Sequence, residues 1–330
     1  MKKILITGIT GLLGSYLAKS LSGKALISGT RRAGSNTDLL GSLAESIQWY
    51  EGEITDVEML TEACQDQDLV IHSAGLVSFD DSKKEALLKT NAQGTACLVN
   101  AMLPLKQKKL VFISSVAALG RQENQLSLTE EQKWLNSELN TPYGISKHLA
   151  ELEVWRGAQE GLQVMVFNPS VLLAKITDER SSSQIYRYVL DGNRYYPKGN
   201  INYIDIRDAV AVMLQLIEEG EWNQRYIISK ESLPYRDFFN EMALVFGKKP
   251  PSIALSNWLA AWVIRWSRLH NWFSKSKLPI SRQTVRAAQT RVGYDNSKIK
   301  EATGYAFTPL KDTFEWAMAN EKEKGESKRT

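Results

Sequence analysis

Cysteine and histidine are scarce in this chain of 330 residues. The two cysteines, Cys64 and Cys97, lie in segments with helical patterning, which favours buried thiols in a reducing, cytoplasmic compartment over a disulfide. The three histidines are spaced too irregularly for a metal site. We therefore expect neither a disulfide scaffold nor a metal centre.

Long apolar runs, internal repeats and low-complexity stretches are absent as well. The chain begins with Met1-Lys2-Lys3 and a short apolar strand, so we expect no secretory signal. An apolar, tryptophan-rich segment runs from Ser256 to Phe273, but Arg265 interrupts it, and a transmembrane helix needs about 20 apolar residues. With 43% hydrophobic and 24% charged residues, the composition is that of a globular protein with one large or two unequal domains.

The net charge of +4 is unevenly distributed. From Lys248 to Thr330 there are 16 Lys and Arg against 7 Asp and Glu, a net charge of +9, which leaves −5 for the first 247 residues. A basic C-terminal part can face anionic substrates or membranes, although solvated helix faces are the commoner explanation. The charged tail after Ala319 is expected to fray.

Short apolar runs alternate with helical patterns through the first 170 residues. This alternation predicts an α/β fold with a Rossmann-like, doubly wound parallel sheet. The expected strands are Ile4–Thr7, Ala25–Ser28, Ile47–Tyr50, Leu69–His72, Leu110–Ile113 and Val164–Phe167. The expected helices are Leu12–Leu21, Val57–Cys64, Asn91–Met102 and Tyr143–Ala158.

The first strand-to-helix turn is rich in glycine. Gly8, Gly11 and Gly14 follow the first expected strand, with the spacing G-x-x-G-x-x-G rather than the common G-x-G-x-x-G. Glycines let the main chain approach a pyrophosphate, and the helix that follows offers free N–H groups and a favourable dipole. A chance cluster of glycines in a tight turn is the alternative. The flanking strand and helix favour a dinucleotide site formed by Gly8, Thr10, Gly11, Leu12, Leu13 and Gly14.

The second expected strand leads to Arg31 and Arg32, where an NAD enzyme often carries an acidic residue for the ribose 2′-hydroxyl. A guanidinium group suits a 2′-phosphate in both charge and geometry. Solvated loop arginines are the alternative interpretation. The sequence favours NADP(H) over NAD(H), with Arg31 as the phosphate ligand.

The pattern Tyr-x-x-Ser-Lys occurs three times, at Tyr143–Lys147, Tyr226–Lys230 and Tyr294–Lys298. A phenol and an ammonium at positions i and i+4 meet only on a helix. On a strand, the same spacing separates them by about 13 Å at about 3.3 Å per residue. The local structure therefore decides which copy can transfer protons.

Only the first copy has helical surroundings. Thr141 and Pro142 form a helix start signal before Tyr143, and Ile145, Leu149 and Leu152 continue a period near 3.6. The β-branched residues around Tyr226 predict a core strand. Tyr294 precedes the capping pair Asp295-Asn296, so it should lie outside a helix that buries Ile299 and Ala302.

These features occur together in the extended short-chain dehydrogenase/reductases, which the chain resembles. The matching segments are TGITGLLG (Thr7–Gly14), Asp56, DLVIHSAG (Asp68–Gly75), TNAQGT (Thr90–Thr95), FISSVAALG (Phe112–Gly120), YGISK (Tyr143–Lys147), NPSVLLA (Asn168–Ala174), NYIDIRDAV (Asn202–Val210) and YDNSK (Tyr294–Lys298). They cover most of the chain in the family's order.

The resemblance implies a catalytic trio of Ser115, Tyr143 and Lys147, with the neighbouring Ser114 in a structural role. It places further cofactor contacts at Asp56, Val57, Ala74, Gly75, Asn91, Tyr143, Lys147, Pro169 and Ser170. Asn91 can either cap a helix or support a proton relay, and the structural role as a cap is favoured. It also implies a homodimer.

The chemistry expected of the trio follows from charge. A free tyrosine has a pKa of about 10, and an ammonium about 4 Å away at an effective dielectric of about 20 can supply the roughly 4 kcal/mol that lower it by three units. Lys147, helped by the positive ring of the oxidised cofactor, is therefore expected to lower the pKa of Tyr143. Tyr143 would protonate the carbonyl oxygen during hydride transfer while Ser115 holds that oxygen.

Two departures concern the substrate. Sugar-nucleotide members of the family usually carry Arg-Pro and Val-Tyr-Gly where this chain has Asn168-Pro169 and Ala118-Leu119-Gly120. The resemblance is therefore closer to the dihydroflavonol reductase and hydroxysteroid dehydrogenase branch, which implies an NADP(H)-dependent oxidoreductase for an apolar ketone or aldehyde. A nucleotide-sugar epimerase or dehydratase with tightly bound NAD and a non-catalytic NADP-sensing module are the alternatives.

The remaining expectations concern domains and partners. Residues 1–170 are expected to bind NADP, with 201–229 returning to that domain, whereas 171–200 and 230–330 form a smaller, mainly helical substrate-binding domain. The tryptophan-rich segment can be a core helix, a pocket wall or an interfacial helix. A small-molecule substrate is expected, with no nucleic acid partner and membrane contact disfavoured.

Overall fold

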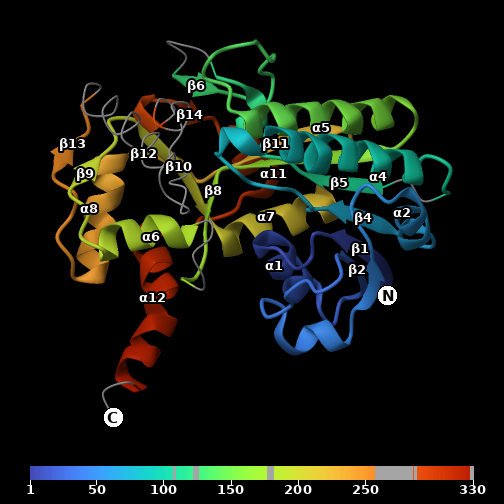
Figure 1. Cartoon of the computed structure of the whole chain (residues 1–330), viewed down its shortest axis with the longest axis horizontal. Helices are drawn as coiled ribbons and strands as arrows, with labels where there is room; N and C mark the ends of the chain where they lie inside the picture. Colours follow the sequence, from blue (N-terminus) through green and yellow to red (C-terminus); the bar gives the residue numbers. More distant parts are fainter. Residues whose placement is uncertain (107–108, 122–125, 177–181, 257–284, 286–287, 328–330) are drawn as a thin grey trace. The chain divides into compact units, whose positions relative to one another are not determined.

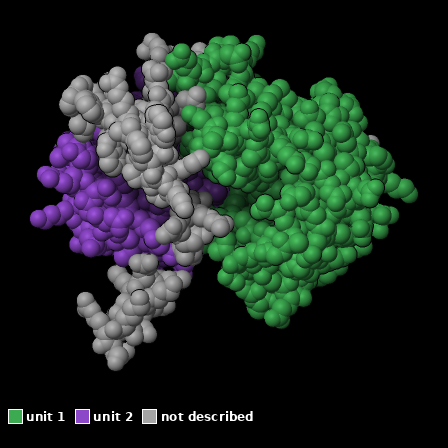
Figure 2. Space-filling view, viewed as in Figure 1, with its two compact units in different colours: residues 1–121, 130–169, 210–227 green, residues 122–129, 170–209, 228–330 purple. Residues whose placement is uncertain are grey.

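A computed structural model describes residues 1–106, 109–121, 126–176, 182–256, 285 and 288–327. The chain divides into two compact units, coloured separately in Figure 2. Unit 1 comprises residues 1–121, 130–169 and 210–227, and unit 2 comprises residues 122–129, 170–209 and 228–330. Of the tryptophan-rich segment Ser256–Phe273, residues 257–273 lie outside the described residues, and so does the choice between its three interpretations.

Unit 1 is built on a seven-stranded sheet in the order β11-β7-β5-β4-β1-β2-β3 (Figure 1). Its strands are β1 (Lys2–Thr7), β2 (Ala25–Arg31), β3 (Gln48–Glu51), β4 (Leu69–His72), β5 (Lys109–Ile113), β7 (Gln163–Pro169) and β11 (Gln224–Ile228). Every pair from β3 through β7 is parallel. The Rossmann-like prediction is confirmed, and the order reverses between β1 and β4, where such sheets bind ligands.

Helices cover both faces of this sheet, with α1 on the face opposite to α2, α4 and α5 (Figure 1). The helices are α1 (Leu12–Leu21), α2 (Val57–Cys64), α3 (Lys84–Leu87), α4 (Gly94–Met102), α5 (Pro142–Gln159) and α7 (Ile206–Glu219). Shorter turns are η1 (Gly41–Glu45), η2 (Asp81–Lys83), the π-helical η3 (Leu88–Gln93) and η4 (Val116–Leu119). One core packs Leu60 of α2, Leu98 of α4 and Val154 of α5 on Phe112 and Val166 of the sheet.

The helix that carries the first Tyr-x-x-Ser-Lys copy begins where the sequence predicts. Thr141 is its N-cap, and the Thr141 hydroxyl accepts a hydrogen bond from the N–H of Gly144. The apolar residues of the helical period do not form its buried face, since Leu149 and Leu152 are 37% and 49% exposed. The buried face instead consists of small and charged residues, namely Gly144, Ser146, Lys147, Ala150, Glu151, Val154 and Gly157.

The other two copies have the predicted local structure. Tyr226 lies in β11, and Tyr294 lies in the two-residue strand β14 (Gly293–Tyr294), ahead of α11 (Ser297–Thr303). Ile299 is buried as expected, whereas Ala302 is exposed because only one side of this short helix faces the core. The first copy alone is helical from its tyrosine to its lysine.

Unit 2 contains small sheets in addition to helices. β10 (Asn200–Asp205) lies between β8 (Val171–Leu173) and β12 (Glu231–Pro234), β13 (Ile253–Ala254) pairs with β9 (Tyr195–Tyr196), and β14 pairs with β6 (Ser127–Leu128). The helices are α6 (Ser182–Leu190), α8 (Tyr235–Phe246), α11 and α12 (Leu310–Ser327). Residues 201–209, grouped with the cofactor half on sequence, belong to unit 2 because β10 pairs with β8 and β12.

Cys64 and Cys97 are free thiols on α2 and α4, the first buried and the second partly buried. Burial raises the pKa of Cys64 to about 12, so this thiol is unreactive. Within the described part of the chain, no helix has both the length and the apolar character that crossing a bilayer requires.

Candidate active site

The glycine turn lies at the point where the strand order reverses. Gly8 has a φ of +67°, and a Cβ there would lie 2.5 Å from the backbone N and Cα of Ala74, at the end of β4. A Cβ on Gly14 would lie 2.4 Å from the carbonyl oxygen of Gly8. Gly11 is the N-cap of α1 and supplies no side chain to cap it, which leaves first-turn N–H groups without a side-chain acceptor. This tight, uncapped turn fits a dinucleotide pyrophosphate.

Thr10, Leu12 and Leu13 belong to the same turn and the start of α1. On the neighbouring strand end, the N–H of Ala74 donates to the Thr7 hydroxyl at 3.3 Å. The same hydroxyl lies 2.6 Å from Nδ1 of His72, whose Nε2 lies 2.9 Å from the hydroxyl of Thr95. Burial, followed by the charge of Lys147, lowers the pKa of His72 to about 3, so this imidazole is a neutral structural bridge.

Arg31 is the last residue of β2 and therefore not a loop arginine. Its Nε donates to Glu51 at 2.8 Å, and its guanidinium carbon lies 4.6 Å from the centroid of the Trp49 ring. The ion pair and the stacking fix the guanidinium at the strand end. The sequence reasoning did not anticipate Glu51, which competes with any anionic ligand of Arg31.

Asp56 and Val57 stand at the start of α2. The Asp56 carboxylate accepts from the N–H of Met59 at 3.1 Å and so caps this helix, while Val57 is 47% exposed. Pro169 ends β7 in unit 1, whereas Ser170 belongs to unit 2 and donates its N–H to Ile228 at 3.0 Å.

Asn91 joins the loop after β4 to the predicted catalytic helix. Its Oδ1 accepts from the N–H of Leu76 at 2.7 Å, and its Nδ2 donates to the Leu76 oxygen at 2.9 Å and to the Ser146 hydroxyl at 2.8 Å. Ser146 in turn donates to the Tyr143 carbonyl oxygen at 2.8 Å. Asn91 lies in the π-helical turn η3, an irregularity frequent at functional sites. No role was predicted for Ser146, the serine of the Tyr-x-x-Ser-Lys motif, although this residue bonds to Asn91.

Ser115 lies between β5 and η4, and Tyr143 and Lys147 lie in the first turns of α5, where the Tyr143 phenol hydrogen-bonds to Ser115. Ser115 is the N-cap of η4, and its hydroxyl accepts from the N–H of Ala117 at 3.2 Å. Lys147 is 4% exposed, and its Nζ donates to the carbonyl oxygen of Ile113 at 2.6 Å. The same ammonium lies 4.4 Å from the centroid of the Phe112 ring.

The pKa of Tyr143 differs from the expectation. Burial raises it, and the hydrogen bond with Ser115 opposes that rise. Burial also lowers the pKa of Lys147 to about 7, against the opposing charge of Glu151. In the protein without its cofactor, the pKa of Tyr143 is therefore raised and not lowered as predicted, because desolvation of the phenol outweighs the hydrogen bond with Ser115.

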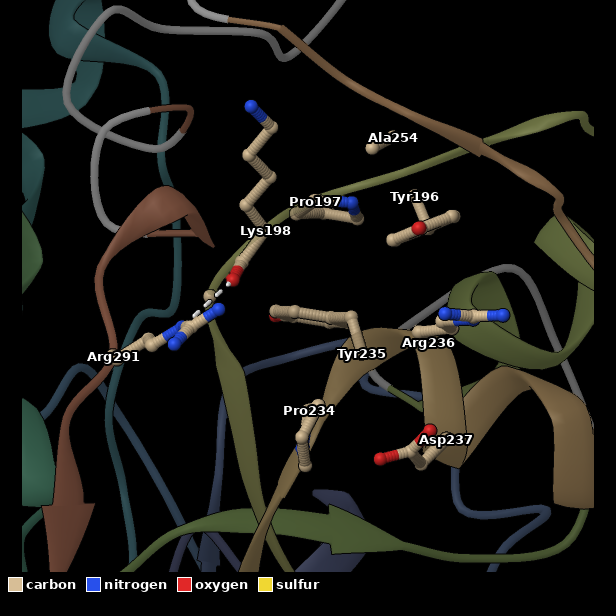
Figure 3. A pocket seen from close by; sticks show the side chains of 10 residues that line it. Tyr196, Pro197, Lys198, Pro234, Tyr235, Arg236, Asp237, Ala254 and Arg291 are labelled. Atoms are coloured by element: carbon tan, nitrogen blue, oxygen red, sulfur yellow. Dashed lines mark hydrogen bonds between the residues drawn. The ribbon is translucent and has the colours of Figure 1, made fainter.

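A separate pocket of about 280 Å³ lies in unit 2 between Tyr196 and Tyr235 (Figure 3). Arg291 points toward Lys198, and the Nε of Arg291 lies 3.5 Å from the carbonyl oxygen of Lys198. The charged side chains of the lining, Lys198, Arg236, Asp237 and Arg291, are exposed, so the pocket holds no desolvated acid–base pair.

A family model for the NAD dependent epimerase/dehydratase family matches residues 4–229. The chain therefore belongs to that family. A Synechocystis protein assigned as a dihydroflavonol 4-reductase is 27% identical over 78% of this chain and 77% of its own.

Other relatives include both reductases and an epimerase. Cinnamoyl-CoA reductase 1 of Petunia hybrida is 24% identical over 98% of this chain and 92% of its own. UDP-glucose 4-epimerase of Neisseria meningitidis is 32% identical over 46% of this chain and 47% of its own.

Solved structures share the fold. The crystal structure of gox2253 has a TM-score of 0.82 at 23% identity, covering 98% of this chain and 99% of that one. The Bordetella bronchiseptica enzyme WbmH in complex with NAD⁺ has a TM-score of 0.75 at 19% identity, covering 98% and 100%. These likenesses support the sheet architecture.

Proposed function

We propose that the chain is an NADP(H)-dependent reductase of an apolar ketone or aldehyde. The observation that carries this proposal is the convergence of Ser115, Tyr143 and the buried Lys147 in unit 1. A phenol that hydrogen-bonds to a serine, close to an ammonium, can deliver a proton to a carbonyl oxygen. The bound cofactor supplies the hydride.

In the proposed reaction each residue acts through one group. The Ser115 hydroxyl holds the carbonyl oxygen, and the Tyr143 phenol donates the proton to that oxygen as the carbon accepts hydride. Lys147 offsets the negative charge left on the Tyr143 oxygen. Gly8, Gly11 and Gly14 cradle the pyrophosphate, and Asn91 holds the loop that carries Ala74 and Gly75.

The apolar substrate class rests on the reductase relatives and on Asn168-Pro169 in place of the Arg-Pro of sugar-nucleotide enzymes. The identity to a UDP-glucose 4-epimerase, confined to about half of the chain, supports a nucleotide-sugar enzyme as the second candidate. Purification distinguishes the two candidate functions, because a nucleotide-sugar enzyme would retain tightly bound NAD. Net NADPH oxidation in a panel of apolar ketones and aldehydes, by protein free of copurified NAD, is the expected result.

We propose further that Arg31 binds the 2′-phosphate of NADP(H). Arg31→Ala is expected to raise the KM for NADPH by about 10- to 100-fold with little change for NADH, since hydrogen bonds to charged groups contribute about 1.5–3 kcal/mol. Glu51→Gln is the matched variant, because it frees Arg31 from its carboxylate partner. It should lower the KM for NADPH several-fold. Equal or better efficiency of the wild type with NADH contradicts this assignment.

A further inference from the structure

Glu151 is a fully buried carboxylate on α5, one turn beyond Lys147. Its Oε1 accepts from the Ser114 hydroxyl at 2.5 Å and from Nδ2 of Asn168 at 2.6 Å. Its Oε2 forms an ion pair with Arg225. An unpaired buried carboxylate is strongly unfavourable, and the three donors from Ser114, Asn168 and Arg225 pair both oxygens of Glu151.

The arginine of this pair is held from two sides. Arg225 comes from β11, and its Nη1 donates to the carbonyl oxygen of Glu130 at 3.2 Å. The Glu130 carboxylate accepts from the N–H of Ile227 at 2.9 Å, which fixes the strand itself. The guanidinium carbon lies 5.9 Å from the centroid of the Trp155 ring. Arg225 is therefore a fixed positive charge rather than a mobile surface side chain.

Two links join Glu151 to the trio. The Asn168 amide that donates to Glu151 also donates to the carbonyl oxygen of Ser115, at 2.8 Å, and so fixes the main chain there. The Glu151 charge also acts on Lys147, where it opposes the lowering of the pKa by burial. His72 of β4 also senses the charge of Lys147. Of the other elements packed on α5, α4 and β7 contain no Asp, Glu, Lys or Arg, and the charged residues of α3 and η3, Lys84, Glu85 and Lys89, are exposed.

We propose that Glu151, held by Arg225 and Asn168, is a positioning residue that keeps the Lys147 ammonium charged and fixes the main chain of Ser115. This inference rests on the proposed roles of Ser115, Tyr143 and Lys147. Glu151 has no contact with substrate in this account. It acts through the charge of Lys147 and, by way of Asn168, through the placement of Ser115.

The test is the pH dependence of alcohol oxidation, where Tyr143 must lose its proton. Glu151→Gln keeps the size of the side chain but removes its charge, so the pKa of Lys147 falls further and less ammonium remains to stabilise the phenolate. The acid limb of the kcat profile is expected to move up by about one pH unit, which is about a tenfold loss at pH 7. The KM should change less than about twofold.

Glu153→Gln is the matched control, because Glu153 lies on the same helix and pairs only with Arg156 among the described ion pairs. Its profile should superimpose on that of the wild type. A Glu151→Gln profile that also superimposes overturns the inference. A loss of activity that is equal at every pH and accompanied by a lower Tm overturns it too, since that result marks a purely structural role.

If Glu151→Gln does not fold, Glu151→Asp carries the test. Its shorter carboxylate withdraws from Arg225 and Asn168, so the acid limb should move in the same direction by less, and an unmoved limb overturns the inference. Tyr143→Phe, measured in parallel, tests the proposed function independently of the role of Glu151. Near-wild-type activity of Tyr143→Phe defeats the proposed function, whereas its inactivity with an unshifted Glu151→Gln profile defeats only the role of Glu151.

Discussion

Tyr143→Phe is expected to lower kcat by roughly 10²–10⁴-fold while NADPH still binds, because the substitution removes one proton donor and leaves the ring in place. The phenol is the group that hydrogen-bonds to Ser115. Its ring packs edge-on against Phe79 at 6.1 Å, a contact that phenylalanine preserves. Turnover and NADPH affinity, measured by fluorescence titration, therefore separate chemistry from binding.

The repeated motif supplies the control for this experiment. Tyr294→Phe removes a hydroxyl from the third Tyr-x-x-Ser-Lys copy, and that buried hydroxyl has no hydrogen-bond partner among the described residues. Its removal should leave kcat within about twofold of the wild type. A Tyr143→Phe enzyme with comparable activity would show that the proton comes from another group.

Gly8→Ala is expected to weaken NADPH binding by at least tenfold, about 1.4 kcal/mol, and to lower the Tm. The added Cβ would lie 2.5 Å from the Ala74 backbone, and neither main-chain segment can yield without moving the end of β1 or β4. The positive φ of Gly8 adds conformational strain, of order 1 kcal/mol. The change therefore alters the turn that receives the pyrophosphate.

Gly23→Ala separates the effect of backbone strain at a positive φ from the effect of a steric contact such as that between Gly8 and Ala74. Gly23 has a comparable φ of +77°, but a Cβ there would meet nothing within 4 Å. This variant should lose a little stability and retain its NADPH affinity. If the two variants match in Tm and in the Kd for NADPH, the contact between Gly8 and Ala74 has no part in cofactor binding.

Local patterns predicted the cofactor half well because each strand and helix carries its own signals. The bounds of α1, α2 and β4 coincide with the predicted ranges. The buried face of α5 could not be read from its apolar period, because Leu149 and Leu152 of that period are exposed. Gly144 and Gly157 allow close packing instead, and Cβ atoms there would lie 2.7 Å from Ala117 O and 2.8 Å from a Val99 methyl.

The charge network could not be predicted because its members are distant in sequence. Glu151 and Arg225 are 74 residues apart, and nothing in the local pattern of β11 marks Arg225 as a partner of α5. Asn168 was recognised only as a departure from the sugar-nucleotide pattern. In the structure its amide joins Glu151 to Ser115, which gives that departure a physical role.

The same limit applies to the pKa of Tyr143. The spacing of Tyr143 and Lys147 predicts an electrostatic coupling, but the burial that opposes it depends on how η4, η3 and α5 pack. Sequence spacing thus indicates which groups meet. The balance of desolvation and charge at those groups requires the three-dimensional structure.

Transfer of deuterium from NADPH labelled at the transferable C4 position tests the central claim most directly. We expect one deuterium on the carbinol carbon of the product for each NADPH oxidised, with an apolar ketone or aldehyde as acceptor. The Tyr143→Phe variant should transfer none above background. Absence of transfer to every acceptor, together with copurified NAD and interconversion of a nucleotide sugar without net cofactor oxidation, would contradict the account.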